Sequence, residues 1–185
     1  MNKRFLFLSG LILAAAISRL IPHPYNFAPI GAMSIFGAAY FTDKKFAFLL
    51  PILGLFISDL LINNILYSGY YSSFTLFTPG FGWTYGAMML IVIAGFFIMK
   101  KVNVTRVIGG ALSASLIFFI VSNFGVWVLG SPGVNNIAYA KDFNGLVECY
   151  ILAIPFFGNT FLSTLIFAYP SVFIYKSLAA RTSAR

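Results

Sequence analysis

The chain has 185 residues, of which 60% are hydrophobic, 18% aromatic and only 9% charged. A soluble domain has about 25% charged residues, so this composition excludes an ordinary soluble protein and indicates one integral membrane domain over residues 1–185. In a soluble protein the net charge of +8 would suggest nucleic acid. In a membrane protein it reports orientation, so we expect a lipid bilayer and no nucleic-acid partner. Cys149 is the single cysteine, which excludes a disulfide framework.

Six apolar segments approach the roughly 20 residues that a helix needs to cross a bilayer. They cover approximately residues 5–21, 27–41, 46–62, 81–99, 107–129 and 145–175. None alternates apolar with polar residues, so the sequence predicts an all-α, polytopic bundle of about six transmembrane helices. The second segment is short and contains Gly31 and Gly37, which favours a tilted or re-entrant helix. The first resembles a signal peptide, but it continues to Ile21; we expect a retained helix, with cleavage as the alternative.

The basic residues follow a strong pattern along these segments. Ten of the twelve lie before the first, after the sixth, or in the connections that share their side: Lys3, Arg4, Lys44, Lys45, Lys100, Lys101, Arg106, Lys176, Arg181 and Arg185. Cytoplasmic loops are enriched in Lys and Arg. The pattern therefore predicts a multi-pass protein of the bacterial cytoplasmic (inner) membrane with both termini in the cytoplasm.

The costly polar residues gather at one predicted depth. Arg19, Asp59, Asn63, Asn123 and Glu148 all fall at the outer ends of their segments. They lie level with the stretch Arg19–Ala32, which contains three prolines and the only histidine. Polar groups inside a membrane mark function by default, and a one-sided set fits an outward-opening pocket better than an ion path.

Several of these residues have alternative interpretations. Arg19 can snorkel to the interface, pair with Asp59 or Glu148, or contact a ligand. His23 is either a packed loop residue or a ligand contact, and Cys149 either a small core residue or a cobalt ligand. The aromatic residues between Tyr67 and Phe81 fit an interfacial belt or a stacking lid.

Small residues recur every four positions on the first segment, at Gly10, Ala14 and Ser18, and on the fifth at Ala111 and Ser115. This spacing lets helices approach closely. It fits packing inside the bundle or a docking face for another membrane subunit.

Enzyme signatures are missing from the sequence, which contains no G-x-S-x-G, no H-E-x-x-H and no glycine-rich phosphate loop with lysine. We therefore expect neither an enzyme nor a cofactor. With one histidine and one cysteine, a two-histidine metal centre cannot form, so no metal site is expected.

Taken together, this pattern resembles the substrate-binding S components of energy-coupling factor (ECF) vitamin transporters. Segments around Arg19–Ala32, Ser58-Asp59, Ser122–Trp127 and Pro155–Thr160 also resemble a small family of uncharacterised bacterial membrane proteins. The S-component likeness implies that a vitamin or related heterocycle, cobalamin included, binds in an outer pocket closed by the first loop. It also implies docking to a coupling subunit with ATPases, for which Gly10, Ala14 and Ser18 are the nearest match.

We therefore expect an uptake protein for a small vitamin-like molecule. The expected substrate-binding residues are Arg19, His23, Tyr25, Asn26, Asp59, Asn63, Asn123, Trp127, Glu148 and Asn159. Two other classes remain open: a non-transport membrane scaffold or assembly factor, and a membrane-embedded enzyme that uses Asp59, Glu148 or His23 as acid or base.

Overall fold

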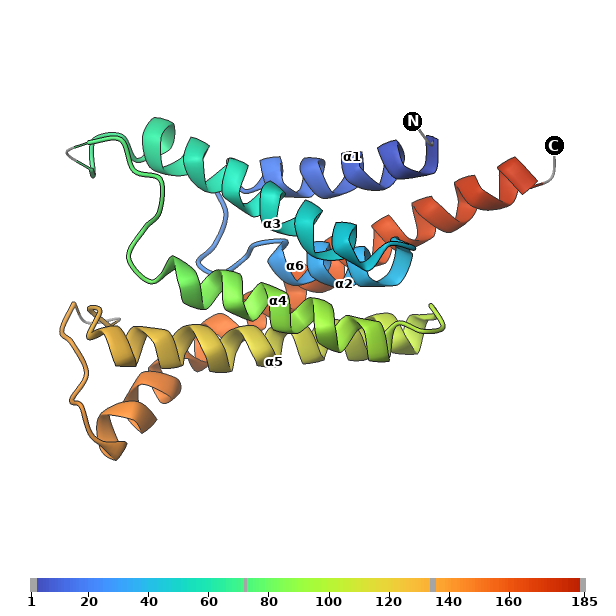
Figure 1. Cartoon of the computed structure of the whole chain (residues 1–185). Helices are drawn as coiled ribbons and strands as arrows, with labels where there is room; N and C mark the ends of the chain where they lie inside the picture. The colour runs from blue at the N-terminus through green and yellow to red at the C-terminus, as the bar shows by residue number, and fades with distance from the viewer. Residues whose placement is uncertain (1–2, 72, 134–135, 184–185) are drawn as a thin grey trace.

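A computed structural model describes residues 3–71, 73–133 and 136–183, and these form an all-helical bundle (Figure 1). Its elements are α1 (Lys3–Ser18), α2 (Ile30–Tyr40), α3 (Lys44–Leu61), the π-helical turn η1 (Ile62–Leu66), α4 (Phe81–Ile98), α5 (Val104–Leu129) and α6 (Phe143–Ser183). The prediction of six helices in one all-α bundle is confirmed.

Within the described residues, four helical segments are long and apolar enough to cross a membrane: Lys44–Leu66, Phe81–Ile98, Val104–Leu129 and Phe143–Tyr175. The other two apolar helices, α1 and α2, are shorter. With 11 residues, α2 is about 16 Å long, roughly half the thickness of the hydrocarbon core. The second predicted span, residues 27–41, is thus a half-length helix that begins after Pro29.

The helix ends follow local sequence signals. The Asp43 carboxylate accepts from the Lys45 backbone N–H at 2.9 Å and starts α3, and the Asn103 side chain accepts from Arg106 N–H at 2.8 Å and starts α5. These are N-cap bonds, which satisfy amides that the first turn leaves unpaired. Gly130 ends α5 with a φ of 66°, a left-handed conformation that glycine adopts without steric cost.

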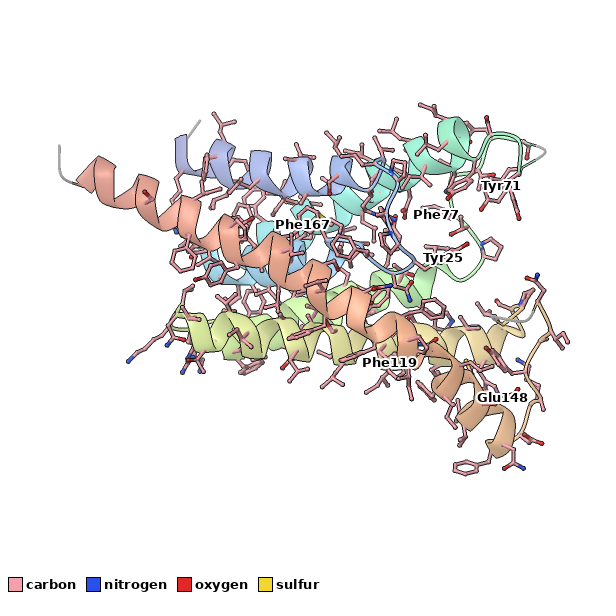
Figure 2. The ribbon with its side chains drawn as sticks, turned by 180° about the vertical axis from the view of Figure 1, so that it is seen from behind. Tyr25, Tyr71, Phe77, Phe119, Glu148 and Phe167 are labelled. Carbon is pink, nitrogen blue, oxygen red and sulfur yellow. The ribbon has the colours of Figure 1, made fainter. Side chains whose placement is uncertain are left out.

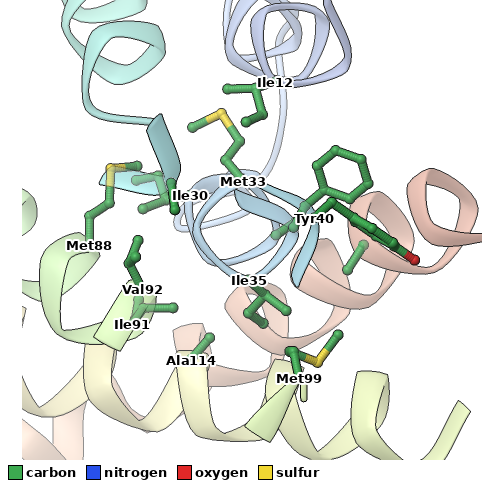
Figure 3. Close-up of a cluster of buried hydrophobic side chains, with 14 of the residues drawn as sticks. Ile12, Ile30, Met33, Ile35, Tyr40, Met88, Ile91, Val92, Met99 and Ala114 are labelled. Carbon is green, nitrogen blue, oxygen red and sulfur yellow. The ribbon is translucent and has the colours of Figure 1, made fainter. Parts of the chain in front are cut away.

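The half-length helix α2 occupies the centre of the bundle, where it packs against each of the other five α-helices. Eight consecutive residues, 30–37, are buried, so α2 has no lipid-facing side over this stretch. Figure 3 shows side chains of the neighbouring helices, including Ile12, Met88 and Ala114, around this helix. Such a position explains why the segment is apolar on every face.

Small residues make that crowding possible. A Cβ added to Gly31 would lie 2.7 Å from the Thr164 hydroxyl oxygen, and one added to Gly37 would lie 2.9 Å from the Ala47 carbonyl oxygen. Lipid tails are as apolar as the side chains, so helices in a membrane associate through close packing of this kind. α2 can therefore touch α6 at Gly31 and α3 at Gly37 only because both positions lack a side chain.

The bundle has two distinct ends, which Figure 1 displays at right and left. The end that carries both chain termini also carries the α2–α3 and α4–α5 connections, and we call it the terminal end. The loops that follow α1, η1 and α5 point the opposite way, and we call that side the loop end. The described basic residues Arg4, Lys44, Lys45, Lys100, Lys101 and Arg106 all belong to the terminal end, whereas Lys141 lies at the loop end.

The long helix α6 crosses the whole bundle and contains Pro155 and Pro170. Proline removes one backbone hydrogen bond and crowds the preceding turn, which bends a helix. The first turns of α6 lean away from the other helices at the loop end (Figure 1). Residues near the start of α6 are thus separated from the centre of the bundle.

Candidate functional site

A cavity of about 730 Å³ opens at the loop end, and we call it the loop-end cavity. Its lining comes from the loop after α1, from α2, α4, α5 and α6, and from the end of the α3–η1 segment. The lining residues are Arg19, Leu20, Ile21, Pro22, His23, Tyr25, Asn26, Ala28, Ile30, Gly31, Ile62, Leu66, Tyr67, Thr84, Ala114, Phe118 and Thr160. Ala114 is the eleventh residue of the 26 in α5, about 15 Å along that helix, so the cavity reaches towards mid-depth of the bundle.

Arg19, the residue that follows α1, bonds to α3 on one side of this cavity. Its Nη1 lies 2.7 Å from Asp59 Oδ1, and the two side chains are 14% and 22% exposed. The same nitrogen also contacts the Ser58 hydroxyl, and it donates to the Leu55 carbonyl at 3.4 Å. The Tyr85 hydroxyl donates to Asp59 Oδ2 at 2.9 Å. Of the sequence-based alternatives for Arg19, the ion pair with Asp59 is therefore present.

The rim of the cavity is a loop that α6 holds in place. Asn159 Nδ2 donates to the Tyr25 carbonyl at 3.0 Å, Thr160 Oγ1 to the Asn26 carbonyl at 3.2 Å, and Ser163 Oγ to the Ala28 carbonyl at 3.0 Å. These three donors lie along one side of α6. The prolines cannot donate backbone hydrogen bonds, so a proline-rich loop depends on side chains from elsewhere to fix its path. Asn159 thus acts on the site indirectly, because its side chain holds the backbone of the rim loop at Tyr25.

The opposite rim is formed by the turn η1 and the loop that follows it. Tyr67 N–H donates to the Ile62 carbonyl at 2.9 Å, five residues back, and places Tyr67 on the cavity wall. Asn64 fixes the following loop through a reciprocal pair, because its Nδ2 donates to the Thr75 carbonyl at 2.9 Å and its Oδ1 accepts from Thr75 N–H at 2.7 Å. Its neighbour Asn63 is buried, and its Nδ2 has no partner among the described residues.

The aromatic residues of the loop between η1 and α4 are of two kinds: some pack against the helices and others are exposed. Phe77 stacks on Phe81 with ring centroids 4.3 Å apart and also packs against Phe56, so it belongs to the packing at the start of α4. Tyr70 and Phe74 are exposed. Figure 2 shows Tyr25, Tyr71 and Phe77 together at the loop end.

The structure does not bring all predicted site residues to the loop-end cavity. Arg19, His23, Tyr25 and Asn26 line it; Asp59 contacts Arg19, and Asn159 contacts the rim. The remaining predicted residues do not line the cavity: Asn63, Asn123, Trp127 and Glu148.

Asn123 and Trp127 lie on the loop-end half of α5, where their side chains bond to the backbone. Asn123 Nδ2 donates to the Phe119 carbonyl at 2.8 Å, and Trp127 Nε1 to the Ala140 carbonyl at 2.8 Å. Glu148 is exposed on the diverging start of α6, away from Tyr25 (Figure 2). Cys149 is buried, and its thiol donates to the Asn123 carbonyl at 3.4 Å, outside the cavity lining. Asn123, Trp127 and Glu148 therefore form no part of this cavity.

The small residues of α1 and α5 differ in their surroundings. Ala111 and Ser115 are fully buried, which is packing inside the bundle. Gly10 and Ala14 are exposed, and a Cβ at Gly10 would have no atom within 4 Å. The Ser18 hydroxyl donates to the Ala15 carbonyl at 2.6 Å within α1. The outer face of α1 at Gly10 and Ala14 is thus open in the isolated chain.

Sequence reasoning missed several residues that build the site. Ser58, Tyr85, Thr84, Thr160 and Ser163 all lie on apolar helices, where a single hydroxyl usually bonds to its own helix. Thr160 and Ser163 carried one usable signal, because they fall one turn apart on the same side of α6 as Asn159.

Chemically, the cavity lining combines hydrogen-bonding groups, such as Arg19 and Thr84, with apolar side chains such as Ile62 and Phe118. Among the described residues, no three His, Cys, Asp or Glu side chains gather where they could hold a metal ion. The arrangement is suited to holding a molecule of moderate size.

No curated protein and no solved structure matches the chain. A family model does match, and it covers residues 1–184. The chain therefore belongs to a family of unknown function, DUF6580.

Proposed function

We propose that this protein is a binding and uptake protein for a small vitamin-like molecule in the bacterial inner membrane. The molecule enters the loop-end cavity from outside, and the terminal end faces the cytoplasm. The observation that carries the proposal is the cavity itself, because about 730 Å³ falls within the usual 300–1,000 Å³ of small-molecule sites. The basic residues of the terminal end support the orientation.

The construction of the cavity also favours ligand binding. The charge of Arg19 is largely buried, which is costly in a membrane, and it lies at the cavity wall beside Asp59. Three α6 side chains hold the rim in one path, which lowers the ordering cost of binding. Both features are typical of a preorganised binding site and not of a packing defect between helices.

The uptake step requires an energy source, and the open face of α1 offers a place for one. Gly10 and Ala14 would let a second membrane helix approach closely. In this proposal an ECF-like coupling subunit with its ATPases docks there, with Ser18 at the end of the same stripe. A vitamin or other heterocycle suits the cavity; for cobalamin, Cys149 supplies no support, since it lies outside the lining.

The proposal is tested by mass spectrometry of small molecules released from gently purified, then denatured, protein. We expect one compound to be retained in near-stoichiometric amount. Thr84→Phe would fill the cavity from α4 and should abolish retention, while Thr105→Phe, the same change on exposed surface of α5, should not. Equal retention by both variants, or no retained compound and no stabilising ligand at all, would refute the proposal.

The open α1 face also favours the second candidate, a membrane scaffold or assembly factor. Under that function a protein partner co-purifies in fixed ratio, Gly10→Leu releases it, and Thr84→Phe leaves the assembly intact. The two candidate functions are thus distinguished by which variant has an effect. Loss of a retained small molecule in Thr84→Phe favours uptake, and loss of a protein partner in Gly10→Leu favours the scaffold.

A further inference from the structure

One side of the Arg19 guanidinium is not used by the protein. Every contact that Arg19 makes with described residues goes through Nη1: to Asp59, to Ser58 and to the Leu55 carbonyl. Nε and Nη2 donate to no described residue. These two nitrogens form the side-on fork of the guanidinium, whose two parallel N–H groups match the two oxygens of a carboxylate. Arg19 lines the cavity, and this fork is the part of its guanidinium that no described residue occupies.

The floor of the cavity carries a second set of donors. Ile30 and Gly31 line it, and they are the first two residues of α2. The first backbone bond of this helix runs from Met33 N–H to the Pro29 carbonyl at 2.9 Å, and Pro29 provides no side-chain cap. The earlier amides therefore have no partner within the helix, and a helix N-terminus carries about half a positive charge.

The charges around the cavity favour an anion over a cation. The cavity lining contains Arg19 and His23 but no Asp or Glu among the described residues. Asp59 balances the charge of Arg19 through Nη1 without reaching the lining. A bound carboxylate would share the guanidinium with Asp59 and face the N-terminus of α2, whereas a cationic amine would meet no carboxylate in the lining.

We infer that the loop-end cavity binds a monocarboxylate. Nε and Nη2 of Arg19 hold its carboxylate group, and the apolar or aromatic remainder of the ligand lies against Ile62, Leu66 and Phe118. This inference rests on the proposed function of the same cavity. The carboxylate fixes the orientation of the ligand, and the apolar lining selects its body.

The test uses the full chain in detergent and matched pairs of heteroaromatic carboxylates and their carboxamides, beginning with nicotinate and nicotinamide, and indole-3-acetate and indole-3-acetamide. Thermal unfolding screens the pairs, and calorimetry gives the Kd of each compound that raises Tm. We expect a carboxylate to bind at least about tenfold more tightly than its amide, since a charge-assisted pair of hydrogen bonds is worth more than a single neutral one.

Two variants assign the effect to Arg19. Arg19→Lys keeps the charge beside Asp59 but removes the fork, so the carboxylate should bind about tenfold more weakly and the amide unchanged. If Arg19→Lys unfolds, the double variant Arg19→Gln, Asp59→Asn removes both charges together and should likewise lose the preference for carboxylates.

Equal Kd values for carboxylate and amide, or an unchanged carboxylate Kd in Arg19→Lys, would overturn this inference and leave the proposed function standing. The inference is also overturned if none of the carboxylates and none of the carboxamides shifts the Tm of the protein. The proposed function fails separately, through the retained-compound experiment with Thr84→Phe.

Discussion

The contacts of Asp59 show how one carboxylate is kept inside an apolar bundle. One oxygen lies 2.7 Å from Nη1 of Arg19, the residue that follows α1, and the other accepts the Tyr85 hydroxyl of α4 at 2.9 Å. The two partners come from different parts of the chain, so the carboxylate also ties the end of α1 to α3 and α4 at the loop end. Removing one member of such a pair leaves the other charged and poorly solvated.

This arrangement makes a graded prediction for stability. Asp59→Asn leaves Arg19 without its counter-charge and should lower the free energy of unfolding by about 3 kcal/mol. Tyr85→Phe loses only one hydrogen bond to the carboxylate and should cost about 1.5 kcal/mol. Unfolding by SDS titration from mild detergent measures both values. The interpretation is wrong if Tyr85→Phe is the more damaging of the two.

At this scale the sequence predicted the partners of Arg19 only in part. The sequence left four alternatives open for Arg19: snorkelling to the interface, a ligand contact, or an ion pair with Asp59 or with Glu148. Which carboxylate pairs with Arg19 depends on how the helices are placed in space, and no local sequence pattern encodes that. The start of α6, which contains Pro155 further along, carries Glu148 away from the bundle. Tyr85 gave no signal, since one hydroxyl on an apolar helix is common.

Among the elements, α2 depends most on the size of single residues. Gly37 faces the backbone of α3, and backbone cannot move aside as a flexible side chain can. Glycine is about 1 kcal/mol less favourable than alanine in a helix, so its presence here indicates that the close contact outweighs helix propensity.

Gly37→Ala should therefore destabilise the bundle by about 1–3 kcal/mol, because its Cβ would lie 2.9 Å from the Ala47 carbonyl oxygen. Gly10→Ala is the matched control on α1, where the new methyl group meets open space, and it should be neutral or slightly stabilising. Thermal unfolding in one detergent compares the two, and the same direction of change in both would contradict this view of α2.

The link between α6 and the rim loop is an element-scale feature as well. Ser163 is fully buried and donates to the Ala28 carbonyl at 3.0 Å. Ser163→Ala should raise the hydrogen-exchange rate of peptides covering residues 21–32 about fivefold, in line with the loss of about 1 kcal/mol. Ser171→Ala, whose hydroxyl bonds to the Phe167 carbonyl within α6, should leave that exchange unchanged.

For the whole molecule, the separation of charge between its ends predicts a single orientation. Gly69 lies in the loop after η1, and Thr42 in the connection between α2 and α3; both are exposed. In intact cells a membrane-impermeant maleimide should label Gly69→Cys but not Thr42→Cys. Cys149 is 2% exposed and should give little background. Labelling of Thr42→Cys alone would reverse the assignment of the two ends.

Span positions could be predicted well where length and hydrophobicity decide. The fourth predicted span, residues 81–99, matches α4 to within a residue, and the fifth differs from α5 only at its start. The central place of α2 could not be predicted, because an apolar face shows that a residue avoids water but not whether lipid or protein covers it. The cavity is a consequence of that placement, so only its loop residues were foreseen.

The half-length of α2 has a consequence for the permeability of the membrane. Below the cavity floor, the axis of the bundle is filled by this helix, nine of whose eleven residues are buried. That is about 16 Å of close-packed helix along the axis of the part of the chain that the structure describes. Vesicles that contain the protein should therefore hold a proton gradient as well as empty ones. Under the proposed function, a ligand could pass from the cavity to the terminal end only if α2 separates from its neighbours, so transport would require a conformational change of the bundle.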